Sequence, residues 1–497
     1  MVDDMDTELL SRIQFGTTTV YHFFFVPISI GLSGFVAGFQ TAWTRTDKTT
    51  YLKLTRFFGT LLLINFVVGI ATGLVQEFQF GMNWSEFSRF VGDIFGAPLA
   101  LEGLLAFFLE STFLGLWTFG WNRLPKKVHL LCIWMVAVST TISAYFILTA
   151  NSFMQNPVGY RYNAELGRAE LVDFGAVLTN PVVLITLPHT IFACYLVGAA
   201  LVIAAAGWNL VQQARRDRTG RAAATPEQPY VRDAEGEERR SAFRTAVKVG
   251  AVGLLICGAG TFVTGDIQGK VMTDVQPMKM AAAEALYETE RPAAFSIITI
   301  GTLDGKHEVW SIKVPRVLSF LATGTVDGEV KGVNELQADY QERFGPGDYA
   351  PYIPITYWTF RAMMGLGIVA FGTGALILWL LRRDRDPAVT GFWGLVWRIG
   401  PPLLPLVPLF ACAFGWIFTE MGRQPWLAHT LMKTSAGVSP NLSPAEVWAS
   451  LTVFTVLYGV LAVIEVRLLM RAITKGLPDI DAEPVSEDEE QPLSYGF

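Results

Sequence analysis

The chain has 497 residues, of which 51% are hydrophobic and 16% charged, and its mean hydropathy is +0.37. Soluble chains usually carry about a quarter charged residues, so this composition excludes an ordinary soluble protein and indicates an integral membrane protein. The net charge of −6 gives no sign of nucleic-acid binding. The first ten residues, MVDDMDTELL, are acidic where a cleavable signal is basic, so we expect the first apolar run to stay in the mature protein.

A transmembrane helix needs about 20 mostly apolar residues, and this length predicts nine spans. They cover residues 12–44, 54–80, 95–121, 127–151, 180–211, 243–264, 356–381, 393–420 and 446–470. Lysine and arginine gather in the loops after spans one, three, five and seven, which places the N-terminus outside and the C-terminus in the cytoplasm. We therefore expect an all-α, polytopic membrane protein whose functional groups lie inside its helix bundles.

The remaining segments differ in composition. Residues 212–242, within the first region of six spans (1–264), are charged and rich in Ala, Gly and Pro, which predicts a flexible cytoplasmic linker. Residues 265–355 form a long outer segment with helix-forming pieces, and a loop of that length is usually functional. The last three spans occupy 356–473, and 474–497 is expected to be an acidic, disordered cytoplasmic tail.

The four cysteines all lie in apolar stretches, where we interpret them as small buried hydrophobes rather than disulfides or zinc ligands. They are Cys132, Cys194, Cys257 and Cys412.

Two carboxylates lie inside the third span, in FGAPLALEGLLAFFLESTF. Glu102 and Glu110 are eight residues apart, which on an α-helix puts them within about 80° of one another and about 12 Å apart along the axis. Ionisable groups at this depth are costly and usually face a bundle interior, where they relay protons or bind ions. The plainer interpretation is a pair of helix-end carboxylates that reach the headgroups.

Four further polar side chains lie within apolar helices: His22, His189, Met363 and Glu465. A lone membrane histidine is more often a helix-packing hydrogen bonder, and a core methionine usually only packs. Together, however, histidine and methionine can ligate a six-coordinate haem. The chain lacks a Cys-x-x-Cys-His motif, so a haem would be bound non-covalently.

Several longer segments carry a specific resemblance. SRIQFGTTTVYHFFFVP, GLVQEFQFGMNWSEFSRFVGDIFGAPLALEGLLAFFLEST, NSFMQNP and GRQPW closely resemble subunit I of the cytochrome bd quinol oxidases, over nearly all spans. GRQPW (422–426) alone would be a weak signal, since it could be an interfacial anchor.

The resemblance implies roles for these residues. His189 and Met363 match the axial ligands of a low-spin haem b, with Arg361 beside that haem. His22 and Glu465 match ligands of the two active-site haems, and Glu102 a third group at the same site. Glu110 matches the next group on a cytoplasmic proton path, with Ser143 on the neighbouring helix a further candidate.

The outer segment matches the family's quinol-binding loop in its short form. Lys279 and Glu284 match that loop's lysine and glutamate, which would hold a menaquinol or a ubiquinol. Without the resemblance we would take this pair as a solvated helix surface, because five residues separate them by about 140°.

The family implies a terminal oxidase of the bacterial cell (inner) membrane, with two haem b and one haem d. It would reduce O₂ to water with quinol beside a second subunit, with or without small single-span subunits. A cyanide-insensitive relative with b haems alone, and a proton-coupled transporter, are the alternatives.

Two features sit awkwardly with this assignment. Pro188, directly before His189, would free a carbonyl one turn earlier and kink span five. Glu465 lies about 28 Å into its predicted span and Glu102 only about 10 Å into its own, although both would serve one site.

Overall fold

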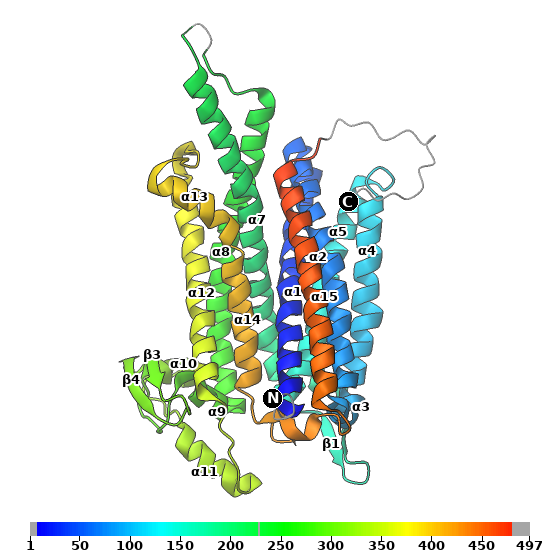
Figure 1. Cartoon of the computed structure of the whole chain (residues 1–497), viewed down its shortest axis with the longest axis vertical. Helices are drawn as coiled ribbons and strands as arrows, with labels where there is room; N and C mark the ends of the chain where they lie inside the picture. Colours follow the sequence, from blue (N-terminus) through cyan, green and yellow to red (C-terminus); the bar gives the residue numbers. More distant parts are fainter. Residues whose placement is uncertain (1–6, 227–228, 480–497) are drawn as a thin grey trace.

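The computed structural model describes residues 7–226 and 229–479. Its long helices lie side by side in an elongated bundle (Figure 1). Eight helical segments are long and apolar enough to cross a membrane, and a bent pair, α13 and α14, forms a ninth span if it crosses as one unit. The prediction of nine spans holds on that count.

The bundle has two sides. One side contains α1 (Thr7–Thr46), α2 (Thr49–Met82), the continuous span α3 (Ser85–Leu101), η1 (Glu102–Phe107) and α4 (Phe108–Phe119), α5 (Lys126–Gln155) and α15 (Pro444–Lys475). The other side contains α7 (Pro181–Ala223), α8 (Ala234–Val275), α12 (Ile353–Leu380), α13 (Gly391–Leu403) and α14 (Leu406–Met421).

Most of the non-membrane structure gathers at one end, which also holds the start of α1 and which we call the loop end (Figure 1). It comprises β1 (Tyr160–Asn163), β2 (Arg168–Leu171), α6 (Phe174–Leu178), α9 (Pro277–Glu284), β3 (Phe295–Gly301), β4 (Glu308–Val314), α10 (Val317–Thr323), α11 (Val333–Phe344), β5 (Trp426–Ala428), β6 (Met432–Lys433) and η3 (Thr434–Gly437). A short 3₁₀ turn, η2 (Arg382–Asp384), lies at the other end, after α12. The strands form two-stranded antiparallel sheets, so the all-α prediction holds for the spans and not for the connections.

Helix α7 joins the two sides because it packs on both α1 and α8. Its middle is rich in small residues, and Ala199, Ala200, Ala205 and Ala206 are fully buried. Small side chains let membrane helices approach closely, since packing rather than water exclusion holds them together.

The segment 212–242, predicted to be a flexible linker, is mostly helical. Helices α7 and α8 continue through it, and residues 224–233 connect them. The connection is fixed by ion pairs: Arg232 contacts both Asp217 and Glu237, and Arg240 Nε donates to Asp386 Oδ1 at 2.5 Å. The mixed-sign composition of this segment indicated disorder. In the fold, however, Arg232 pairs with an acidic residue of each helix, Asp217 of α7 and Glu237 of α8. The acidic tail falls largely outside the described residues.

The four cysteines are free; Cys132, Cys194 and Cys257 are buried as expected, whereas Cys412 is partly exposed. Pro188 lies inside α7, which continues past it as one helix.

The depth mismatch between Glu102 and Glu465 came from a wrong helix boundary. The third span begins at Ser85 rather than residue 95, and α15 begins at Pro444. At 1.5 Å per residue, Glu102 lies about 26 Å and Glu465 about 32 Å from the loop end of their helices. The two carboxylates therefore reach similar depths.

Backbone contact between α1 and α7 depends on two glycines. A Cβ on Gly31 would lie 2.9 Å from Gly198 N, and a Cβ on Gly198 would lie 2.6 Å from the Gly31 carbonyl carbon. We expect Gly31→Ala to cost about 1–3 kcal/mol, because backbone atoms cannot yield to the methyl group. The thermal unfolding midpoint of the detergent-purified protein measures this. Gly38→Ala, on the same helix with nothing within 4 Å of the new Cβ, is the control. Equal midpoints for both variants would contradict this account of the crossing.

Candidate functional site

His189 and Met363 come from one group of packed helices, α7, α8, α12 and α14. His189 Nδ1 hydrogen-bonds to Thr264 Oγ1 at 3.0 Å, which fixes the ring and directs Nε2 away from that contact. Glycines stand opposite both side chains: a Cβ on Gly265 would lie 3.3 Å from His189 Cε1, and one on Gly415 would lie 2.8 Å from Met363 Sδ. The side chains of His189 and Met363 therefore each lie against a glycine, where the facing helix has no side chain in the way.

His22 is held in the same way on the other side of the bundle. Its Nδ1 hydrogen-bonds to Thr72 Oγ1 of α2 at 2.9 Å, and a Cβ on Gly73 would lie 3.2 Å from its Cε1. A metal-binding histidine usually makes a hydrogen bond through its other ring nitrogen, which sets the tautomer. The Thr–His contact on each side has this arrangement.

Glu465 reaches the same helices from α15. Among the described residues, the buried face of α15 consists of Val447, Leu451, Tyr458 and Glu465, spaced four and seven apart. Two turns before Glu465, the ring of Tyr458 stacks on Tyr21 at 4.3 Å, and Tyr21 donates its hydroxyl to the Tyr458 carbonyl at 2.8 Å. These contacts direct the Glu465 face toward α1, the helix that carries His22.

Glu102 and Glu110 lie on a helix whose geometry the sequence did not predict. Glu102 opens a π-helical segment that ends at Phe107. A π-bulge adds one residue to an α-helix, so the eight-residue interval spans about 700° rather than about 800°, and the carboxylates lie within about 20° instead of 80°. The predicted shared face is therefore more closely aligned than expected. Glu110 is 8% exposed, and Glu102 Oε1 accepts a hydrogen bond from Ser143 Oγ of α5 at 2.7 Å.

The loop pair Lys279 and Glu284 is buried in α9, 5% and 3% exposed. The alternative of a solvated helix surface is therefore wrong. The two side chains point to different partners: Lys279 Nζ donates to Gln155 Oε1 of α5 at 2.5 Å, and Glu284 Oε2 accepts from Arg361 Nη2 of α12 at 2.6 Å. The angle of about 140° between Lys279 and Glu284 around α9, expected from the sequence, thus lets the two side chains contact α5 and α12.

Burial shifts the titration of both groups. The pKa of Lys279 is lowered to about 7, chiefly by desolvation and also by the Arg423 charge, while Glu420 opposes the shift. Desolvation raises the pKa of Glu284, while the Arg361 guanidinium and the Ser296 backbone N–H act in the opposite direction. The loop thus holds a lysine and a glutamate that are both poised to change charge.

Sequence reasoning quoted two motifs without assigning their polar residues. Asn151, from NSFMQNP, donates to Glu420 Oε1 at 2.9 Å, and Glu420 also pairs with Arg423 of GRQPW. Arg423 is 2% exposed, so it is not an interfacial anchor. A Cβ on the preceding Gly422 would lie 2.8 Å from Lys279 Cγ, which shows that the GRQPW turn lies against the loop lysine.

The donor set fits haem better than a bare metal ion. No cluster of three or more His, Cys, Asp or Glu side chains that could hold a metal exists in residues 7–226 and 229–479. Single His, Met or Glu side chains could hold the iron of a haem, because the porphyrin itself supplies further ligands. Arg361, two residues before Met363, also keeps Nε and Nη1 buried without a hydrogen-bond partner among the described residues. A guanidinium left open in this way suits a carboxylate such as a haem propionate.

Comparison with known proteins identifies the family. The family model for cytochrome bd terminal oxidase subunit I matches residues 10–477. The chain belongs to this family.

Similar cytochrome bd subunits are found in several bacteria. Cytochrome bd ubiquinol oxidase subunit 1 of Bacillus subtilis is 44% identical, over 95% of this chain and 94% of its own length. Cytochrome bd-II ubiquinol oxidase subunit 1 of Escherichia coli is 33% identical, over 97% and 99%. The solved bd oxidase of Geobacillus thermodenitrificans superposes with a TM-score of 0.80 at 26% identity, over 95% of this chain and 99% of that one. The protein is thus a multi-pass membrane subunit of a terminal oxidase.

Proposed function

We propose that the chain is the haem-bearing subunit of an electrogenic quinol:oxygen oxidoreductase. The observation that carries this is the pair of membrane histidines, His22 and His189, each fixed through Nδ1 and each facing a glycine. A transporter would not need a methionine set opposite a glycine in the His189 group. The loop end is the outer face in this proposal, as the lysines and arginines of the other end indicate.

His189 and Met363 would hold a low-spin haem b beside Arg361, while His22 and Glu465 would hold a high-spin haem b and a haem d, with Glu102 beside them. When bound, these haems supply electron transfer and oxygen reduction. The protein's own contribution is to fix these donors, with Glu102 and Glu465 at similar depths, and to exclude water with its helices.

At the loop end, Lys279 and Glu284 would bind a menaquinol or ubiquinol. The carboxylate oxygen of Glu284 not bonded to Arg361 is the natural acceptor for a quinol hydroxyl proton, and Lys279 would hold the other polar end of the ring. Protons released here leave on the outer side.

Protons for water would come from the cytoplasmic side through Glu110 and then Glu102, whose Oε1 already accepts a hydrogen bond from Ser143. The π-bulge aligns the two carboxylates along one face, so a proton need not pass through lipid. Turnover would build a membrane potential without a pump.

A second subunit would cover the exposed apolar face of α15, where Val453, Val456, Val460 and Val463 are 50–62% exposed. Small single-span subunits could bind the remaining faces of the complex, in the bacterial inner membrane.

The first test is a dithionite-reduced minus air-oxidised visible spectrum of the detergent-purified complex. We expect b-haem bands and a chlorin band at longer wavelength than these; b bands alone would instead indicate the cyanide-insensitive type.

Met363→Leu should change the low-spin b signal, because leucine has no sulfur donor. Met364→Leu, one position along the same helix, is the matched control. An unaltered low-spin signal in Met363→Leu would disprove the ligand assignment.

Replacing Glu110 with glutamine should slow oxygen uptake by about tenfold or more, because an amide cannot accept and release a proton. Haem content should stay at the wild-type level. Glu86→Gln, which alters a partly exposed carboxylate at the loop end of α3, should leave the rate unchanged. A wild-type rate in Glu110→Gln would remove this residue from the proton path.

The low pKa of Lys279 predicts a pH-dependent KM for quinol. Below pH of about 7 the amine is charged and holds the quinol, and above it the amine is neutral, so KM should rise as pH increases through 7. The Lys279→Arg variant keeps its charge and should not show this rise.

Other charged groups also face Lys279. Arg423 and Glu420 form an ion pair, and the pKa of His429 is lowered to about 4 by burial and by the charges of Lys279 and Arg423. The pKa of Glu284 is also raised, so only the difference between the two KM profiles reports on Lys279. Parallel profiles would exclude the lysine as the titrating group.

A further inference from the structure

The hairpin of β3 and β4 turns an apolar face away from the protein. The cross-strand neighbours on this face are Ile298 with Ile312 and Ile300 with Trp310. These four side chains are 37–51% exposed. In a two-stranded sheet with one face in water, the alternation runs the other way, with apolar side chains toward the core and polar ones outward. The exposed face is therefore apolar where a sheet in water would be polar.

The opposite face of the hairpin is polar and lies against α12. Ser296 and Thr299 are buried there, and the Tyr357 hydroxyl of α12 lies 2.7 Å from Ser296 Oγ and accepts a hydrogen bond from the Thr299 N–H at 2.6 Å. Lys313, the cross-strand neighbour of Ser296, pairs with Glu308 at 2.8 Å. The polar side chains of the hairpin thus find partners within the protein, while its apolar side chains face outward.

Contacts with α12 show how deep the hairpin lies, and Figure 1 shows it beside the loop end of that helix. At the hairpin tip, the Tyr352 hydroxyl donates to the Leu303 carbonyl at 2.8 Å. At the hairpin base, the Arg361 guanidinium lies 4.7 Å from the centre of the Phe295 ring. Tyr352 and Arg361 are separated by about 14 Å along the helix axis. The hairpin therefore runs along α12 toward the membrane interior rather than outward into water.

Two exposed tryptophans indicate where α12 meets the surfaces of the bilayer. Trp358 and Trp379 are 49% and 47% exposed. Their positions differ by about 32 Å along the helix, which matches the thickness of the hydrocarbon core of a bilayer. Tryptophan is enriched at both membrane–water interfaces. Because Trp358 directly follows Tyr357, the residue that holds Ser296, the hairpin lies at the level of the interface on the loop end.

The exposed face of the hairpin continues into the exposed surface of α12. Leu303 at the hairpin tip contacts Tyr352, and Ile355 lies one turn of α12 further on; all three are exposed. Helix α15, which we propose to meet the second subunit, belongs to the other side of the bundle (Figure 1). Lipid is therefore the partner that fits this face, as it fits the exposed part of α12.

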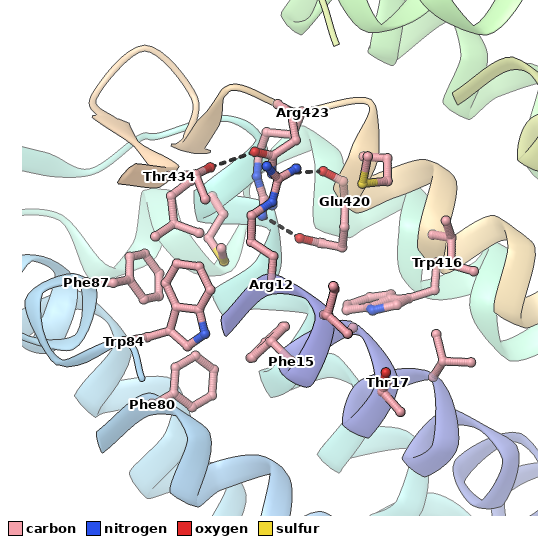
Figure 2. Close-up of a pocket in the computed structure, with 18 of the residues that line it drawn as sticks. Arg12, Phe15, Thr17, Phe80, Trp84, Phe87, Trp416, Glu420, Arg423 and Thr434 are labelled. Carbon is pink, nitrogen blue, oxygen red and sulfur yellow. Dashed lines mark hydrogen bonds and ion pairs between the residues drawn. The ribbon is translucent and has the colours of Figure 1, made fainter. Parts of the chain in front are cut away.

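The hairpin is also distinct from the cavity of about 640 Å³ at the loop end, which lies where Arg423 pairs with Glu420 (Figure 2). Among the described residues that line this cavity, none belongs to β3 or β4. The apolar face of the hairpin is thus an outer surface and not a wall of that cavity.

We propose that β3 and β4 form a membrane anchor, whose apolar face lies in the interface between the lipid headgroups and the acyl chains. The charged side chains of the tip, Asp304 and Lys306, would lie among the headgroups, and the hairpin base would lie among the acyl chains. Burial of an apolar face at this depth is how interfacial amphipathic segments bind membranes. Since the Ser296 N–H donates to Glu284 Oε2 at 3.2 Å, the anchor would also hold Glu284 at a fixed depth below the bilayer surface.

The test uses nitroxide spin labels on the whole complex, reconstituted in nanodiscs of phosphatidylethanolamine and phosphatidylglycerol. Labels at Ile300→Cys and Ile312→Cys report on the apolar face. Ile368→Cys, at an exposed position in the middle of α12, is the lipid control, and Glu342→Cys, at an exposed position on α11, is the water control. Complex without an added cysteine gives the background from the native cysteines. The measurement is the collision rate of each label with oxygen, which concentrates in lipid, and with a water-soluble nickel chelate.

We expect the ratio of oxygen to nickel collisions at Ile300 and Ile312 to resemble the ratio at Ile368. It should exceed the ratio at Glu342 by about fivefold or more, because the nickel chelate is excluded from the acyl chains. The ratio should also rise from Trp310→Cys to Val314→Cys, since Val314 lies opposite Phe295 at the hairpin base, about 13 Å along β4 from Trp310.

Three results would overturn the proposal. One is a ratio at Ile300 and Ile312 as low as that at Glu342, which would place the hairpin in water. Another is a pair of labels shielded from both agents, which would mean that a protein chain rather than lipid covers the face. The third is a ratio that falls from Trp310 to Val314. Haem spectra of the same samples verify that the labelled complexes are intact.

Discussion

Every polar group within these helices has to find a partner in a solvent that offers none. For three of the candidate site residues, the structure meets this requirement with hydrogen bonds between neighbouring helices. Thr72 holds His22, Thr264 holds His189, and Ser143 contacts Glu102, each from an adjacent helix. These contacts stabilise the packing and, at the same time, orient the side chains that we propose as haem ligands and proton carriers.

The loop end follows the same rule with charged groups. Arg361 joins Glu284 of α9 to α12, the helix that also carries Met363. Lys279 is fixed on Gln155 of α5, and the turn containing Gly422 closes against its side chain. Removing one partner of a buried charge pair costs about 3–5 kcal/mol, so the position of α9 is tied firmly to the bundle. Helix α9 is thus held against the bundle on both sides.

Much of this architecture could be predicted from the sequence. The spans are visible as apolar runs because hydrocarbon requires length and low charge, and the chemically important side chains stand out as the rare polar residues within them. Boundaries were harder: SEFSRFVGD, before the expected start of the third span, is polar on one face, and the helix nevertheless begins at Ser85. The π-helix after Glu102 has no sequence signature, because it depends on how the span packs on α5. The helical hairpin at 212–242 was missed since its charges are compensated only in three dimensions, by contacts such as Arg240 with Asp386.

The GRQPW turn shows most clearly why partners cannot be read from a motif. As a string it suggests an anchor at the membrane surface, with arginine and tryptophan facing headgroups. In the fold, Arg423 and Trp426 are both buried, and Tyr349 from the long loop stacks on the Trp426 ring at 5.7 Å. Arg423 pairs with Glu420, which lies at the end of α14. Glu420 also accepts a hydrogen bond from Asn151 of α5, almost 270 residues earlier in the chain. One short turn thereby joins α14, α5 and the long loop, so its residue types are set by three neighbours. A substitution there would act on all three contacts together, which makes this turn the point where the loop and the bundle depend on each other.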